Sequence, residues 1–138
     1  MASRSLSDLT PKARELCMKW IDACRKEGVD VLVYCTYRDG KEQDELYMIG
    51  RTKPGNIVTN ARAGDSWHNW RRAWDAVPLV AGKPQWNGAS LYAKMGRVAE
   101  ELGIEWAGRW TGKLKETAHF QVTEGVTLAQ LKSGQATA

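Results

Sequence analysis

Residues 29–37, VDVLVYCTY, alternate with the two-residue period of a β-strand, and both alternating sets are largely apolar. The odd-numbered positions carry Val29, Val31, Val33 and Cys35, and the even-numbered ones include Leu32, Tyr34 and Thr36. A strand that is apolar on both faces is typical of a strand covered from both sides. We therefore expect an inner strand of a sheet here.

Helical patterns flank this strand. Thr10 and Pro11 supply a capping residue and a first-turn proline, an apolar stripe with helical spacing follows, and Gly28 can end the helix. Asp39 predicts the start of a shorter helix that continues to about residue 49. A third helix is expected after Ser90, which we interpret as its cap, and before residue 103.

Shorter strands are expected at residues 74–80, 104–107 and 119–123, with a final helical turn at 127–131. Residues 51–65 have little periodicity, and a loop of this length in a compact domain is usually functional. The order of elements predicts the α+β class, with a small, mostly antiparallel sheet and flanking helices. The 138 residues fit a single domain.

Composition narrows the classes of function. A net charge of +4 favours polyanionic partners, such as nucleic acid, anionic lipid or an anionic cell-wall polymer. No run of about 18 apolar residues exists, so we expect no membrane-spanning helix, and the first residues lack the apolar core of a secretory signal. Cys17, Cys24 and Cys35 are too widely spaced for a zinc knuckle and are expected to be reduced, buried apolar residues.

The two histidines of the chain each have a carboxylate close by in sequence. Asp75 follows His68 by seven residues, and Glu116 precedes His119 by three. A catalytic zinc needs about three histidine or carboxylate ligands, an open position for water and a carboxylate base. The spacing suits neither an ideal helix nor an ideal strand, so a bend from loop into strand is expected to bring His68 and Asp75 together. On the residues alone, a metal site and two ordinary structural histidines both remain open.

The segment SWHNWRRAWD at residues 66–75 resembles the S-x-H-x(3)-x-A-x-D signature of the zinc peptidases that include D-alanyl-D-alanine carboxypeptidases and phage L-alanyl-D-glutamate endolysins. ETAHFQ at 116–121 is similar to their second motif, E/D-x-x-H followed by F-Q. Thr36-Tyr37-Arg38, Gln43, Leu46-Tyr47, Gly50-Arg51-Thr52 and Val58-Thr59-Asn60-Ala61 match further blocks in order. The resemblance spans residues 12–123 and implies the fold of the hedgehog and D-Ala-D-Ala peptidase group.

The resemblance also implies roles for single residues. His68, Asp75 and His119 would bind one Zn²⁺, and Glu116 would act as the general base. Arg38 would stabilise the oxyanion of the reaction or bind a substrate carboxylate. Ser66, Gln43 and Tyr47 match positions that line the substrate groove, and Trp110 is a candidate wall of that groove. Arg71 stands where the family usually has glycine, which puts the shape of the groove in question.

We therefore expect a phage-type endolysin that hydrolyses the L-Ala–D-Glu bond of peptidoglycan stem peptides in host lysis. The alternatives are D-Ala–D-Ala carboxypeptidase activity and a non-catalytic zinc-binding or wall-binding module. Nucleic-acid binding would explain the charge but not the paired histidines and carboxylates, so peptidoglycan is the expected partner. A monomer is expected, made in the host cytoplasm and released through a holin-type pore to act on the wall in the periplasm.

Overall fold

Local capping signals place the first two helices where the sequence predicts them. The computed structural model describes residues 2–112 and 115–134. Helix α1 (Pro11–Lys26) begins after Thr10, whose hydroxyl accepts the Ala13 N–H at 3.2 Å. Helix α2 (Gly40–Met48) begins after Asp39, whose carboxylate accepts the Glu42 N–H at 2.8 Å. Both caps satisfy backbone donors that the first turn of a helix leaves free.

The later helices differ in how they begin. Helix α3 (Ala89–Glu101) is preceded by Gly88 and has no side-chain cap, so the expectation that Ser90 caps it is wrong by two positions. Helix α4 (Leu128–Ser133) begins after Thr127, which forms a reciprocal capping box with Gln130. None of the helices in the described ranges is long and apolar enough to span a membrane.

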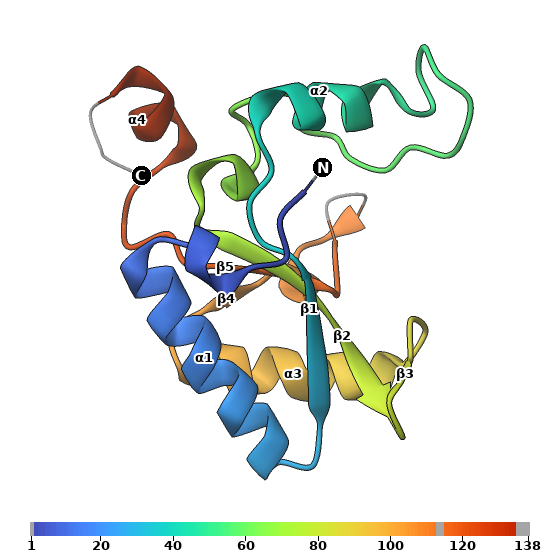
Figure 1. The fold of residues 1–138 in the computed structure, drawn as a ribbon, viewed down its shortest axis with the longest axis vertical. Coiled ribbons are helices and arrows are strands. Elements are labelled where there is room, and N and C mark those ends of the chain that lie inside the picture. The colour runs from blue at the N-terminus through green and yellow to red at the C-terminus, as the bar shows by residue number, and fades with distance from the viewer. Residues whose placement is uncertain (1, 113–114, 135–138) are drawn as a thin grey trace.

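The described strands form the small antiparallel sheet that the sequence predicts. They are β1 (Asp30–Cys35), β2 (Ala73–Val80), β3 (Lys83–Pro84), β4 (Glu105–Trp106) and β5 (His119–Gln121). Their order is β1-β2-β5-β4, and β3 pairs with the far end of β2 (Figure 1). The central strand β2 therefore joins β1 to the C-terminal strands, which brings residues far apart in sequence to one sheet.

Strand β1 is an edge strand, so the expectation of an inner strand is wrong. Among the described strands it pairs with β2 alone, and Leu32 on its even-numbered face is 39% exposed. The odd-numbered face, including Val31 and Val33, packs toward the core. On the other face Tyr34 lines a cleft. The second set of apolar residues therefore belongs to a cleft wall and a partly exposed edge rather than to a covered interior.

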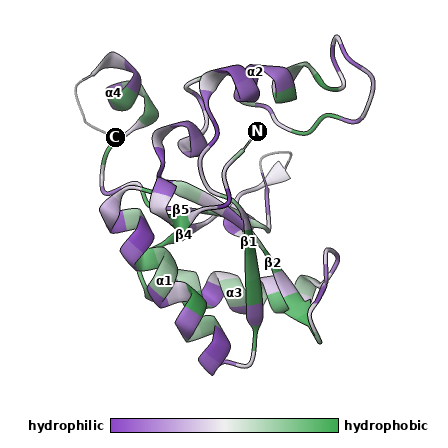
Figure 2. Cartoon of the chain, in the orientation of Figure 1, coloured by the Kyte–Doolittle hydropathy of each residue, from purple (hydrophilic) through white to green (hydrophobic). Residues whose placement is uncertain are grey.

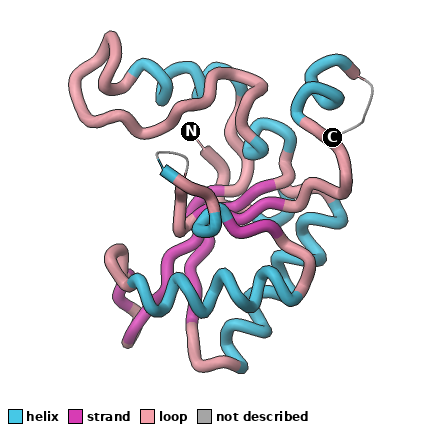
Figure 3. The backbone as a smooth tube through the Cα atoms, turned by 180° about the vertical axis from the view of Figure 1, so that it is seen from behind, coloured by secondary structure: helices cyan, strands magenta, loops and turns pink. Residues whose placement is uncertain are grey.

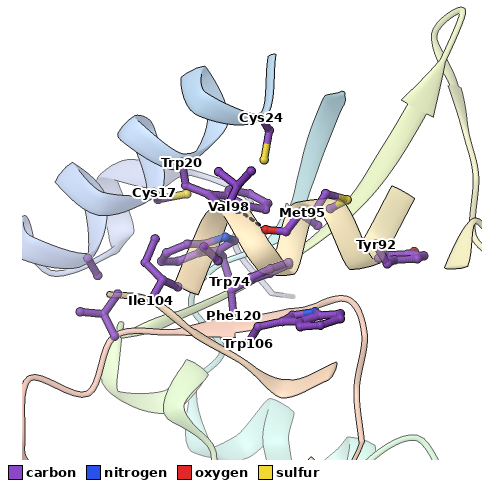
Figure 4. Close-up of a cluster of buried hydrophobic side chains, with 14 of the residues drawn as sticks. Cys17, Trp20, Cys24, Trp74, Tyr92, Met95, Val98, Ile104, Trp106 and Phe120 are labelled. Carbon is purple, nitrogen blue, oxygen red and sulfur yellow. Dashed lines mark hydrogen bonds between the residues drawn. The ribbon is translucent and has the colours of Figure 1, made fainter. Parts of the chain in front are cut away.

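Helices α1 and α3 contact each other and the sheet, and the core lies between them and the strands (Figures 1 and 3). Figure 4 shows Trp20 of α1 at the centre, where its indole N–H donates to the Met95 carbonyl at 3.0 Å. The Trp20 and Phe120 rings are 4.5 Å apart, and Phe120 stacks on Trp74. Cys17 and Cys24 lie in this core as reduced residues, as the sequence predicts.

Polar elements occupy the other end of the molecule. Helix α2 and the long loop after it lie opposite α1 and α3 (Figures 1 and 3). In Figure 2, β1 and β2 carry the apolar colours of the core, whereas α2 is largely hydrophilic. An ion pair between Lys132 and Asp65, 2.6 Å long, ties α4 to the end of the loop. The functional residues of the next section lie where the sheet meets this polar end.

Candidate metal centre and cleft

Three structural elements bring His68, Asp75 and His119 together. His68 lies on a 3-10 helix, Trp67–Trp70, that turns into β2, and this is the predicted bend from loop to strand. Asp75 of β2 and His119 of β5 are partners in the antiparallel register. His68 Nε2 is 3.1 Å and His119 Nδ1 is 3.2 Å from the same oxygen, Asp75 Oδ1. The structure thus unites the three predicted ligands.

The outward nitrogens of both rings are held by carbonyl oxygens. His68 Nδ1 is 2.9 Å from the backbone oxygen of Thr36, and His119 Nε2 is 2.8 Å from Gln121 Oε1. The Gln121 amide nitrogen donates to Glu105 at 3.1 Å, which turns the amide oxygen toward His119. Because a carbonyl oxygen only accepts, each outward nitrogen carries the hydrogen of the neutral ring. The nitrogens that face Asp75 are then the ones that would bind a metal, in exchange for any proton they carry.

The spacing and charge of this donor set fit Zn²⁺. Two ligand atoms about 2.0–2.1 Å from a tetrahedral zinc lie about 3.3 Å apart, close to the separations of 3.1 and 3.2 Å. Burial disfavours a charged His68 ring, yet the Asp75 carboxylate outweighs it and raises the pKa of His68 to about 10. Burial likewise opposes ionisation of Asp75, but the two histidines hold its pKa well below the usual value. The Asp75 carboxylate therefore favours a positive charge, a proton or a metal ion, between itself and the two histidine rings.

Cys35 lies beside this group and was not a predicted site residue. Ligand atoms of Cys35, His68 and Asp75 all lie within 4.8 Å of one another. The Cys35 sulfur, however, faces His68 Nδ1 at 3.8 Å, the nitrogen that already donates to Thr36, and it accepts from Arg38 at 3.5 Å. The thiol thus lies on the outer side of the ring. Only the register of β1 with β2, which pairs Cys35 with Asp75, reveals this neighbour.

Glu116 and Arg38 lie on the cleft side of the three donors. Glu116 Oε2 is 3.9 Å from His119 Nδ1, and its side chain is 49% exposed. Arg38 Nη2 is 3.9 Å from Asp75 Oδ2, and Nη1 donates to Gln43 at 3.0 Å. A solvent-accessible carboxylate and a braced guanidinium therefore flank the donors, as a base and an oxyanion-binding group require.

A cleft of about 790 Å³ opens over these residues. Ser66 and Trp110 both line it, where the sequence predicts a substrate groove. The Ser66 hydroxyl also accepts the His68 N–H at 3.3 Å and so caps the 3-10 helix. Trp110 lies 5.8 Å from the His119 ring, and its indole N–H donates to Glu105 at 3.0 Å. Both residues thus shape the cleft and support the donors.

The structure places Gln43 and Tyr47 behind the cleft rather than on it. Gln43 is fully buried, and its amide nitrogen donates to the Ala61 carbonyl at 2.8 Å. The Tyr47 ring is covered by the guanidinium of Arg51 at 3.8 Å and by that of Arg62 at 4.9 Å. Their contacts brace the loop of residues 51–65, and that loop supplies part of the cleft wall.

Arg71 keeps the backbone conformation that glycine would adopt. Its φ of 61° is left-handed, directly after the 3-10 helix that carries His68. The side chain points to the N-terminal segment, where Nη1 donates to the Asp8 carbonyl at 3.1 Å and the guanidinium stacks over Tyr37 at 3.9 Å. The substitution therefore leaves the bend intact and fastens the N-terminal segment to it.

Known proteins resemble this chain in sequence and in structure. The family described as D-alanyl-D-alanine carboxypeptidase matches residues 59–122, which include the three donors and Glu116. The chain is 38% identical to the peptidoglycan L-alanyl-D-glutamate endopeptidase CwlK of Bacillus subtilis, over 84% of this chain and 74% of that protein. Its structure resembles the L-Ala D-Glu endopeptidase ChiX of Serratia marcescens with a TM-score of 0.61 and 26% identity, covering 89% of each chain.

A second solved structure shares the fold alone. The vancomycin-resistance D,D-pentapeptidase VanY, determined in complex with Zn(II), is similar with a TM-score of 0.63 and 18% identity, covering 91% of this chain and 76% of that one. The α+β architecture is therefore shared by peptidases of different named specificities.

Proposed function

The chain belongs to the D-alanyl-D-alanine carboxypeptidase family of zinc-dependent peptidoglycan peptidases, and from this premise we propose that it hydrolyses the L-Ala–D-Glu bond of stem peptides. The observation that carries the proposal is the convergence of His68 and His119 on one oxygen of Asp75 at the floor of a cleft. The bond is chosen because CwlK and ChiX are both named as endopeptidases for it.

His68, Asp75 and His119 would hold one zinc ion per chain. When bound there, the ion supplies Lewis acidity, which makes water more acidic and polarises the scissile carbonyl. The second hydrogen bonds of the imidazoles, to Thr36 and Gln121, place a ring hydrogen on each outward nitrogen and aim the other nitrogen at Asp75. These contacts are the reason that the rings are ready to bind a metal without rearrangement.

Glu116 is the group that moves protons. Its carboxylate lies at the rim of the donor set and is open to the cleft. It takes a proton from the attacking water and delivers it to the nitrogen of the departing D-Glu, so that the amine leaves neutral. No imidazole is free for this task, because both histidines of the chain are used as ligands.

Arg38 stabilises negative charge on the substrate. Its guanidinium is held by Gln43 and by the proximity of Asp75, so it meets the developing oxyanion without paying the cost of ordering a flexible side chain. Ser66 and Trp110 contact the stem peptide from the walls of the cleft in this proposal.

Mass spectrometry of digested muropeptides tests the bond. Cleavage at L-Ala–D-Glu adds one water and exposes the D-Glu amine, while the D-Ala residues stay attached. The second candidate, D-Ala–D-Ala carboxypeptidase activity, is favoured by the description of the matching family. Release of free D-alanine without L-Ala–D-Glu cleavage would establish that candidate and refute the first.

We further propose that the protein is a monomeric phage endolysin that acts in host lysis. The proposal rests on the motif resemblance to phage endolysins, and it places synthesis in the host cytoplasm and passage to the periplasmic wall through a holin-type pore. Expression in the cytoplasm of a Gram-negative host with and without a holin tests it. Lysis that requires both the holin and Glu116 supports the role, and lysis at the same rate without the holin contradicts the export route.

A further inference from the structure

Trp86 is a large aromatic residue of the cleft that the proposed chemistry does not use. It lies in the turn between β3 and α3 and is 56% exposed. Five tyrosine and tryptophan residues of the described chain line the cleft, and Trp86 is the exposed one among them. Tyr92 is buried and the other three are half-buried. A tryptophan left half in water at the wall of a binding cleft is an apolar surface that a ligand can cover.

The position of the ring is supported by its surroundings. Trp86 packs edge-on against Tyr34, with ring centroids 5.2 Å apart and an interplanar angle of 73°. The turn beneath it is fixed by two backbone bonds, from Gln85 to the Pro78 carbonyl at 2.8 Å and from Gly88 to the Gln85 carbonyl at 3.0 Å. A braced aromatic ring loses little freedom on binding, which favours a contact surface.

Tyr34 connects this ring to the metal centre. It directly precedes Cys35 in β1, and Cys35 pairs with Asp75 across the sheet. Tyr34 and Trp86 both line the cleft that also contains Asp75 and Glu116. The Trp86 platform, by which we mean Trp86 with Tyr34 behind it, therefore belongs to the wall of the same cleft as the donors.

The chemistry of the substrate places a sugar close to the scissile bond. This step depends on the proposed L-Ala–D-Glu specificity. In peptidoglycan the L-Ala amine is acylated by the lactyl group of a muramyl sugar, so one residue and one short linker separate the sugar from the scissile carbonyl. Two such units extend roughly 7 Å. An enzyme that cuts this bond must accommodate a sugar beside its metal, whereas an enzyme that cuts D-Ala–D-Ala handles the far end of the stem.

We propose that the Trp86 platform binds the muramyl sugar of the substrate, with the C–H face of the pyranose ring packed on the indole. Such a face is apolar, and its removal from water against an aromatic ring is favourable. The platform thereby fixes which end of the stem peptide enters the cleft. It adds a glycan subsite to the peptide site at the zinc.

A matched pair of substrates isolates the sugar. One is N-acetylmuramyl-L-Ala-γ-D-Glu-diaminopimelate, and the other replaces the muramyl group by an acetyl group, so that both contain the same scissile amide. We expect Trp86→Ala to reduce kcat/KM on the muramyl substrate by a factor about tenfold larger than on the acetyl substrate, equivalent to ~1.4 kcal/mol. Trp86→Phe should keep most of the wild-type preference for the muramyl substrate, because it retains an aromatic ring. Equal losses on the two substrates would overturn the proposal.

The control variant is Val80→Ala. Val80 is 52% exposed at the end of β2 but does not line the cleft. This substitution should change kcat/KM on the two substrates by the same factor. A loss of discrimination equal to that of Trp86→Ala would trace the effect to the hairpin as a whole and refute the assignment to the ring.

Binding without hydrolysis separates this inference from the proposed function. The probe is the disaccharide N-acetylglucosaminyl-N-acetylmuramic acid, titrated into the zinc-loaded wild-type protein labelled with ¹⁵N. The indole N–H signal of Trp86, identified by its loss in Trp86→Phe, should shift, and other indole signals should shift less. A shift in a protein that fails to cut L-Ala–D-Glu would reject the proposed bond but retain the sugar subsite. Cleavage of L-Ala–D-Glu by a protein whose Trp86 signal does not shift with the disaccharide would retain the proposed bond and reject the sugar subsite.

Discussion

Replacing Gly96 by alanine should destabilise the protein, although alanine is ordinarily the better residue inside a helix. Gly96 lies in α3 against the Trp106 ring, and a Cβ there would be 2.1 Å from Trp106 Cδ2. Carbon atoms in contact normally lie about 3.5–4.0 Å apart. Gly108 lies equally close to the ring, because a Cβ there would be 2.1 Å from Trp106 Cζ2. The indole of Trp106 thus fills the space between two glycines.

The magnitude follows from three opposing contributions. Forcing a methyl group into a packed core costs about 1–3 kcal/mol. Displacing the ring breaks the 2.8 Å bond from its indole N–H to the Thr117 carbonyl, which costs about 1 kcal/mol more. The higher helix propensity of alanine returns about 1 kcal/mol. We expect a net loss of about 2 kcal/mol, with reduced activity as well because Thr117 adjoins Glu116.

Urea unfolding of the zinc-loaded proteins measures this free energy. The same substitution in a Trp106→Leu background removes the obstructing ring, so its cost should fall by at least about 1 kcal/mol. A Gly96→Ala variant about 1 kcal/mol more stable than the wild type, as the propensity alone predicts, would refute the packing of Trp106 between the two glycines.

Three further predictions concern single residues. Burial raises the pKa of the Cys24 thiol to about 12, so the contribution of Cys24 to the free energy of unfolding is complete below the unfolded pKa of about 8.5 and is lost as pH rises toward 12. Under reducing conditions, urea unfolding should show that Cys24→Ala loses about 1.4 kcal/mol less stability than the wild type between pH 7.5 and 9.5. Equal losses in the two proteins would contradict the burial of the thiol. Arg71→Gly should be about 1 kcal/mol more stable than Arg71→Ala in thermal unfolding, because glycine alone adopts a φ of 61° without strain; an alanine variant of equal stability would exclude the left-handed bend. Glu116→Gln should retain one equivalent of zinc by metal analysis and lose roughly 10²–10⁴-fold in kcat, whereas unchanged turnover would remove Glu116 from proton transfer.

Features that depend on neighbouring residues in the chain could be predicted from the sequence. The caps at Thr10 and Asp39 act within three residues, so the first two helices lie where their patterns place them. The position of β1 at the edge could not be predicted, because an apolar second face suits a buried strand and a cleft wall equally well. Only long-range strand pairing distinguishes the two.

The candidate site divides in the same way. The spacing of His68 and Asp75 indicates a bend, and the structure contains one. The hydrogen bonds that fix the histidine rings come from the Thr36 backbone and from Gln121, and they depend on how separate segments meet in the fold. The family resemblance places Gln43 on the groove. Its position in the motif does not reveal that the loop of residues 51–65 folds over it.

An anomalous diffraction map of the zinc-loaded protein at the zinc absorption edge tests the proposed metal centre most directly. We predict one peak per chain, about 2.0–2.1 Å from His68 Nε2, from His119 Nδ1 and from an oxygen of Asp75. The Cys35 sulfur should lie outside bonding distance, on the far side of the His68 ring. A peak bonded to Cys35 and lacking His119, or a site without Asp75, would contradict the ligand set and the mechanism built on it.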